Sequence, residues 1–245
     1  EIPHFGPWLV KEYGEAERAI AERNPYYWKV DPEGNQLPYI DSVEIKIVQA
    51  PDLIPLSIIQ GDVDFQIRQL EIKDTPLLIE NQEKGNYEVR MWKRGDCSFA
   101  TVDIQFCYIN QDPAIGELLW NRNFRLAMSH AINRERINEI VFLGLSKPVQ
   151  FTMFPDGPEF LSERGQKVLH DWQNLAREHD PEKAKALLDE IGVKDVNGDG
   201  MREKPDGTPL ELILDVDVEG KAWVETMQLV KEDWAAVGLN LILNV

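Results

Sequence analysis

The chain has 245 residues, 43% of them hydrophobic, which suffices for one sizeable core or for one core with a small appendage. Its formal net charge of -17 at pH 7 argues against nucleic acids and anionic membrane surfaces as partners, because both require clustered Lys and Arg. No apolar run approaches the roughly 20 residues of a transmembrane helix, and no targeting leader opens the sequence.

The N-terminal segment predicts a short hairpin. Residues 5–23 alternate around Gly14, and such alternation about a turn residue is typical of two paired strands. An aromatic loop, residues 26–28, follows Pro25, because the residue before a proline is biased towards extended backbone. These aromatic side chains are predicted to cover the local core; a stacking surface for a ligand is the alternative.

Strand and helix patterns then alternate along the first half of the chain. Strands are predicted at residues 43–47, 63–65, 87–92 and 100–110, the first of them with one buried face. Helices are predicted between them, at 51–61 and 70–82. Short strands alternating with helices indicate an α/β layer around a mostly buried sheet.

The stretch at residues 110–148 carries the clearest helical pattern. Its apolar residues recur at i, i+3, i+4, i+7 and i+8, which predicts a helix with one buried stripe. The stripe consists of Phe124, Ala127, Met128, Ala131 and Ile132. Asn133 interrupts the pattern, and a second helix is predicted from residue 134 until Gly144 and Pro148 end it.

The C-terminal part is predicted to finish the α/β layer. Residues 151–172 lack a steady period and are predicted as an irregular excursion with one helical turn. Asp180 and Pro181 begin a helix that runs to Gly192. The remaining elements are a turn-rich loop at 195–208, a strand at 210–218, a helix at 223–237 ended by Gly238, and a strand at 239–245.

The loop at residues 195–206 has part of a calcium-binding pattern. Asp195, Asn197 and Asp199 offer oxygen ligands at alternate positions before a glycine, as calcium loops do. The twelfth position holds Asp206 instead of a bidentate glutamate, and a strand follows where a helix should. The pattern therefore favours a metal-free acidic hairpin, with a calcium site as the alternative.

Other residue types give no sign of bond chemistry or of a cofactor. The four histidines, His4, His130, His170 and His179, have no metal-ligand spacing. We expect His130 to be packed beside the apolar stripe. No nucleophile, phosphate-binding or dinucleotide-binding motif is present. The sequence therefore predicts neither a metal nor a cofactor.

The chain has two cysteines, which are too few for a framework of several disulfides. Cys107 lies in an apolar run and is expected to be a buried free thiol, with a bridge to Cys97 as the alternative.

A candidate ligand-binding loop lies between the strands predicted at 87–92 and 100–110. It offers hydroxyl groups, backbone groups and one aromatic ring where a ligand could approach strand ends. Its candidate residues are Asp96, Cys97, Ser98, Phe99 and Thr101. An ordinary surface turn is the alternative.

The sequence FRLAMSHAINRERINEIVFLGLSKP at residues 124–148 resembles the (V/F)RqAlsyAiDRe-I signature of the family 5 solute-binding proteins of ABC importers. Four further segments match the family in the same order: NQDP at 110–113, RNPYYW at 23–28, LPY at 37–39 and QGDVDF at 60–65. Five matches in order are far more specific than any single one.

This resemblance implies an α/β fold with a mixed sheet flanked by helices, forming one lobe of a type II, two-lobed binding protein. Residues 1–42 would then be a fringe of the first lobe, 43–238 the second lobe, and 239–245 a strand returning towards the first. The resemblance also implies a piece of a longer chain, because the residues with which peptide-binding members read their ligand lie beyond the position of Val245.

The function implied by the resemblance is capture of a peptide or an oligosaccharide in a cleft between two lobes, without bond chemistry. The loop at 96–101 would line that cleft. The implied protein is monomeric and extracytoplasmic, either periplasmic or anchored as a lipoprotein, and it docks on the permease subunits of an ABC transporter.

Two other classes of function remain open from the residues alone. The abundant carboxylates would permit a hydrolase, either a glycosidase or a peptidase, if two of them met in a pocket. A calcium-stabilised interaction module would follow if the loop at 195–206 bound the ion.

Overall fold

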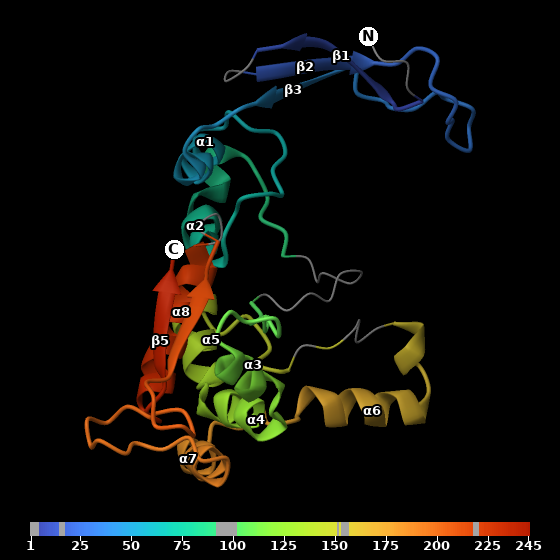
Figure 1. Cartoon of the computed structure of the whole chain (residues 1–245). Helices are drawn as coiled ribbons and strands as arrows, with labels where there is room; N and C mark the ends of the chain where they lie inside the picture. The colour runs from blue at the N-terminus through green and yellow to red at the C-terminus, as the bar shows by residue number, and fades with distance from the viewer. Residues whose placement is uncertain (1–4, 15–17, 92–101, 151, 153–156, 218–220) are drawn as a thin grey trace. The chain divides into compact units, whose positions relative to one another are not determined.

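The computed structural model describes residues 5–14, 18–91, 102–150, 152, 157–217 and 221–245. The chain divides into two compact units, Glu1–Val89 and Arg90–Val245 (Figure 1). The lobe boundaries expected at residues 42 and 238 concern a larger two-lobed protein and stay a prediction.

Unit 1 begins with an antiparallel sheet of order β1-β2-β3 (Figure 1), which confirms the predicted hairpin and the strand after it. Its strands are β1 (Trp8–Tyr13), β2 (Arg18–Arg23) and β3 (Ser42–Lys46). In β3, Val43 is half-buried but Ile45 is 56% exposed, so the predicted buried face is wrong. Alternation fixes which side chains share a face, but burial also needs a second layer, and β3 packs mainly on its neighbour β2.

The helices of unit 1 form a small core of their own. Their bounds are η1 Pro51–Leu53, α1 Ile54–Ile59, η2 Ile72–Asp74 and α2 Thr75–Gly85. Ile54 and Ile58 of α1 are buried against Leu78 of α2. The Tyr87 hydroxyl donates to the Leu78 carbonyl at 2.6 Å, so the chain leaving α2 is fastened back onto the same core.

Three predicted strands are wrong within the described residues. Residues 63–65, 87–91 and 102–110 are outside helices and strands. A strand exists only with a hydrogen-bonded neighbour, and none of these segments joins a ladder. The apolar residues of the first two serve the helical core instead, where Val63, Tyr87 and Val89 pack.

Unit 2 contains the two helices predicted at its centre. Its first helices are α3 (Pro113–Trp120), α4 (Arg122–Ala131) and α5 (Arg134–Phe142). Four stripe residues of α4 are at most 3% exposed: Phe124, Ala127, Met128 and Ala131. Ile132 is half-buried and lies just past the end of the helix. The buried stripe is therefore confirmed for α4 itself.

The segment predicted as irregular contains a real helix, so that prediction is wrong. After η3 (Pro158–Phe160), α6 runs over Glu163–Gln173, and the Ser162 hydroxyl caps its start by accepting from Gly165 N at 3.0 Å. Only Gly165 and Leu169 of α6 are buried. So sparse a buried face leaves little apolar period to detect, and the N-cap serine is the signal that the pattern offered.

The remaining helices and strands of unit 2 follow the prediction. They are α7 (Pro181–Glu190), β4 (Glu211–Asp215), α8 (Lys221–Ala235) and β5 (Asn240–Asn244). β4 and β5 pair in parallel, and α8 forms the crossover between them. Gly238, at φ +85°, turns the chain from α8 into β5, and a Cβ there would lie 3.2 Å from the Gly200 carbonyl oxygen.

The core of unit 2 forms where α4, α7, α8 and β5 meet. α4 packs on α7, and α8 packs on β5. Trp234 of α8 is buried and its indole Nε1 donates to the Met128 carbonyl at 3.1 Å, so its polar group is satisfied inside the core. The α/β class is confirmed, with antiparallel strands in unit 1 and parallel strands in unit 2. None of the helices described is long and apolar enough to cross a membrane.

Candidate functional site

The predicted ligand-binding residues Asp96, Cys97, Ser98, Phe99 and Thr101 lie outside the described residues. The described chain resumes at Val102. Val102, Asp103, Ile104 and Phe106 line a cavity of unit 2, so the predicted loop is continuous in sequence with a cavity wall.

This cavity, about 780 Å³ in volume, lies wholly within unit 2 and is a candidate ligand-binding cavity. Its walls come from α4, α5, α8, the end of α6 and the connecting segments 102–106 and 146–150. The volume falls in the range of about 300–1,000 Å³ that is typical of small-molecule pockets.

Helix α4 supplies both the core and a cavity wall. Its fully buried residues Phe124 and Ala127 lie in the core, whereas Arg125, Leu126 and Ser129 line the cavity and are half-buried. The same amphipathic helix therefore packs in the core of unit 2 with one face and lines the cavity with another.

A polar cluster joins three cavity-lining residues, Ser129, Arg134 and Gln150. Arg134 donates from Nη2 to the Ser129 hydroxyl at 2.8 Å and from Nη1 to the Ser129 carbonyl at 2.9 Å. Gln150 donates from Nε2 to the same hydroxyl at 2.6 Å, and Ser129 in turn donates to the Ala176 carbonyl at 2.8 Å. The cluster fixes the junction of α4 and α5 to the segment after α6.

The guanidinium of Arg134 is costly to keep charged in this place. Burial lowers its pKa to about 10, the nearby charge of Arg177 acts in the same direction, and Glu135 opposes both. At neutral pH the group is still protonated and brings a poorly solvated positive charge to the cavity wall.

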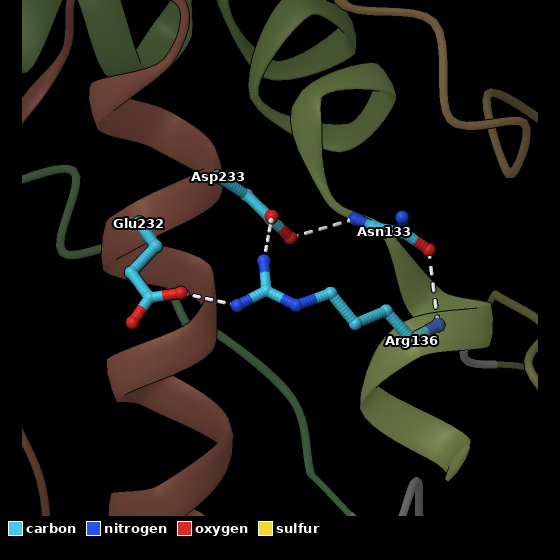
Figure 2. A network of polar contacts seen from close by, with 4 residues as sticks. All are labelled: Asn133, Arg136, Glu232 and Asp233. Atoms are coloured by element: carbon cyan, nitrogen blue, oxygen red, sulfur yellow. Dashed lines mark hydrogen bonds and ion pairs between the residues drawn. The ribbon is translucent and has the colours of Figure 1, made fainter. Parts of the chain in front are cut away.

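A second network holds α5 against α8, and Figure 2 shows its four residues. The buried carboxylate of Asp233 accepts from Asn133 N at 2.8 Å and from Arg136 Nη1 at 3.0 Å, while Arg136 Nη2 also pairs with Glu232. The Asn133 side chain accepts from Arg136 N at 3.0 Å and so caps α5. Glu232 and Asp233 raise the pKa of Arg136 above its ordinary value. The network therefore ties α5 to α8, two helices that line the cavity.

The acidic loop at 195–206 satisfies its own ligand atoms. The two carboxylate oxygens of Asp195 accept from Gly198 N at 2.6 Å and from Gly200 N at 2.9 Å. Arg202 ties the loop to neighbouring helices by donating to Asp189 and to the Val237 carbonyl. The described part of the chain has no group of three or more His, Cys, Asp or Glu side chains suited to hold a metal ion.

The expected packing of His130 is confirmed and that of Cys107 is wrong. His130 is 4% exposed, and its Nδ1 lies 3.0 Å from the Glu178 carbonyl oxygen. Cys107 is exposed, because residues 102–110 do not form the buried strand that was predicted. Since Cys97 lies outside the described residues, the alternative bridge stays untested.

The aromatic loop of unit 1 departs from its predicted role as a cover. Tyr26 is 90% and Trp28 is 70% exposed, so neither covers the core of unit 1. Lys29 lies 5.3 Å from the centre of the Trp28 ring. The loop is shaped by Asn24, whose side chain accepts from Tyr26 N at 3.0 Å and donates to the Gly6 carbonyl.

Sequence patterns did not reveal the polar cluster or the network around Arg136. Their partners are far apart in the chain: Arg136 and Asp233 are separated by 97 positions. The signal available was the charged sequence at 134–136 directly after the capping residue Asn133. The hydrolase alternative would need two acids in a pocket, whereas Asp103 is the one carboxylate among the described lining residues of this cavity.

Comparison with known proteins agrees with this architecture. The family model described as bacterial extracellular solute-binding proteins, family 5 (middle), matches residues 2–245. The periplasmic alpha-galactoside-binding protein of Rhizobium meliloti (strain 1021) is 26% identical over 266 residues, covering 99% of this chain and 35% of the relative.

Two solved structures show the same fold. An oligopeptide-binding protein OppA is 33% identical, with a TM-score of 0.60, covering 100% of this chain and 37% of that one. The periplasmic binding protein MelB of Agrobacterium fabrum C58, solved with stachyose, is 22% identical, with a TM-score of 0.70, covering 98% of this chain and 36% of that one. The chain therefore spans little more than a third of the length of these relatives, and it belongs to the family 5 bacterial extracellular solute-binding proteins.

Proposed function

We propose that this chain is the second-lobe part of an extracytoplasmic binding protein that captures a peptide or an oligosaccharide for import by an ABC transporter. The observation that carries this proposal is the match of the family 5 model to residues 2–245. Two relatives give the ligand classes by their names, an alpha-galactoside-binding protein and an oligopeptide-binding protein.

The mechanism is closure on the ligand without bond chemistry. Two lobes of such a protein each contribute part of the contact, and closure removes most of the ligand surface from water. In this proposal the loop containing Asp96, Cys97, Ser98, Phe99 and Thr101 forms part of the contact on the second lobe. Its support is the resemblance to the family, in which the corresponding segment lines the cleft between the lobes.

The proposed protein acts as a monomer on the outer side of the cytoplasmic membrane, free in the periplasm or held there as a lipoprotein, and its closed form docks on the permease subunits. Sedimentation of the ligand-bound protein at the mass of one chain, and recovery of the protein from a periplasmic or membrane-surface fraction, would support this. A stable dimer or recovery from the cytosol would contradict it.

Calorimetric titration of the full-length protein with a random pentapeptide mixture and with stachyose tests the function. We expect saturable binding of at least one of them, and chromatography should return the ligand unchanged. Cleavage of the peptides or of the sugar would support the hydrolase alternative instead.

The site is tested by Phe99→Ala and by a variant with alanine at both Ser98 and Thr101. Phe99→Ala should weaken binding by about 1–3 kcal/mol, the usual scale for losing a packed aromatic contact at an interface, without a matching loss of stability. Phe65→Ala, at an exposed aromatic of unit 1, is the matched control and should bind like the wild type. Wild-type affinity in both loop variants would remove this loop from the site.

A further inference from the structure

The cavity of unit 2 has the opposite charge balance to the chain as a whole. The chain has 43 acidic residues against 26 Lys and Arg. The described lining residues carry four cations, Arg122, Arg125, Arg134 and Lys147, and one acid, Asp103. A cavity lined by one sign of charge concentrates ions of the other sign, so this cavity attracts anions although the molecule repels them.

No described carboxylate forms an ion pair with these four cations. The half-buried Arg125 donates to the carbonyls of Leu119 and Trp120 at 2.6 and 2.7 Å, and Arg134 donates to neutral oxygens of Ser129 and Arg177. Elsewhere in unit 2, by contrast, Arg136, Arg177 and Arg202 each pair with an acid. Neutral acceptors satisfy hydrogen bonds but carry no countercharge, and Glu135, whose charge acts on Arg134, pairs directly with Arg177 instead.

An orphan hydroxyl lies in the same cavity. Thr226 of α8 lines it and is 5% exposed, and its Oγ1 has no hydrogen-bond partner among the described residues. A buried hydroxyl without a hydrogen-bond partner costs free energy. Such a group therefore indicates a hydrogen-bond partner on a bound ligand.

Apolar side chains also form much of the wall. Among them are Ile132, Phe142, Val230 and Trp234. Water gains few hydrogen bonds at such a surface, whereas an apolar group of a ligand would be well placed there.

We propose that this cavity is an internal binding site for an amphipathic organic anion, a molecule with an apolar body and one carboxylate. The carboxylate compensates Arg134, the Thr226 hydroxyl donates to an oxygen of the ligand, and the apolar body fills the space beside Ile132 and Val230. The site goes beyond solute capture, because the proposed solute contact is the loop at 96–101 and not this cavity.

Octanoate is the probe, and octanol and octylammonium are its matched neutral and cationic controls. Calorimetric titration of the full-length protein should show one octanoate bound per chain, at least tenfold more tightly than octanol, with no binding of octylammonium. Equal binding of octanoate and octanol, or no binding of octanoate, would overturn the proposal.

The variants locate the site. Arg134→Met should weaken octanoate about tenfold or more and leave octanol within twofold, because only the charged head group loses its partner. Arg134→Lys keeps the charge and should recover most of the affinity. Arg164→Met, at an exposed arginine of α6 outside the cavity lining, should bind octanoate like the wild type. Unchanged octanoate affinity in Arg134→Met would contradict the assignment.

Thr226→Val provides a test that does not depend on the arginine. Removing an unsatisfied hydroxyl without changing the side-chain shape should raise the melting temperature of the ligand-free protein by about 2–4 °C, while octanoate binding weakens several-fold. A lower melting temperature with unchanged binding would show that the hydroxyl serves the fold. Failure of either test leaves peptide and stachyose binding unaffected, so it is distinguishable from failure of the proposed function.

Discussion

Helix α4 and strand β3 both carry regular apolar patterns, yet only the pattern of α4 is fully buried. The stripe of α4 meets α7 and α8, and Phe124 is fully buried. The alternating residues of β3 pair correctly with β2, but Ile45 is more than half exposed. A pattern therefore predicts the element and the face, whereas the packing partner decides whether that face contributes to stability.

The largest expected effect is at Met128, in the buried stripe. Met128→Asp places an unpaired carboxylate in the core of unit 2 and should cost several kcal/mol, which is comparable to the whole stability of a domain. Ile45→Asp, on the exposed strand, should change stability by less than about 0.5 kcal/mol. Thermal melting of both variants measures this difference. Equal losses would mean that the sheet of unit 1 is buried in the native protein.

A smaller effect is expected at the network of α5 and α8. Asp233→Asn and Arg136→Met should each cost about 1–3 kcal/mol, the range for hydrogen bonds to charged groups, since Asp233 is buried but Arg136 is about one-third exposed. The double variant should lose less than the sum of the two, because both changes remove one shared contact. Strict additivity in urea unfolding would show that the pair does not couple the two helices.

The ion pair of Asp112 and Lys204 predicts a pH-dependent effect. Lys204 donates to Asp112 at 2.7 Å and lowers the pKa of that carboxyl below its ordinary 3.8. The pair therefore stabilises unit 2 above about pH 4 and loses this contribution as the pH falls through the lowered pKa.

Asp112→Asn tests this, because asparagine still caps α3 but carries no charge. The wild type should melt above the variant at pH 7, and the difference should shrink below pH 3.8. A difference in melting temperature that is constant across this pH range would show that the ion pair does not contribute to stability.

The smallest effect is expected at the loop 195–206. Both oxygens of Asp195 already accept backbone hydrogen bonds, so millimolar calcium should leave the melting temperature unchanged. A rise of several degrees that Asp199→Ala abolishes would restore the calcium alternative.

Local signals predicted most of the fold. The stripe at Phe124, the cap at Asp180 and the glycine at 238 are properties of neighbouring residues, and each marks an element where the structure has one. Helix α6 was not predicted because only two of its residues, Gly165 and Leu169, are buried, and two residues do not give a visible apolar period. The residues 102–110 were misassigned because an apolar run does not reveal whether a neighbouring strand will pair with it.

The candidate site was less predictable than the fold. The cavity is lined by residues from separate parts of the chain, among them Arg134, Gln150 and Thr226. No local spacing in the sequence indicates that these residues line the same cavity. The ligand loop at 96–101 was inferred from its small polar residues between two predicted strands and from the resemblance to the family, and it stays a prediction.

Hydrogen exchange of the full-length protein tests the central claim, that the chain supplies one side of a solute site. With saturating stachyose or pentapeptide, amides in residues 96–101 should exchange more slowly than in the free protein, while amides of α6, at Glu163–Gln173, should exchange at the same rate in both. Saturable binding with unchanged exchange at 96–101 would contradict the account.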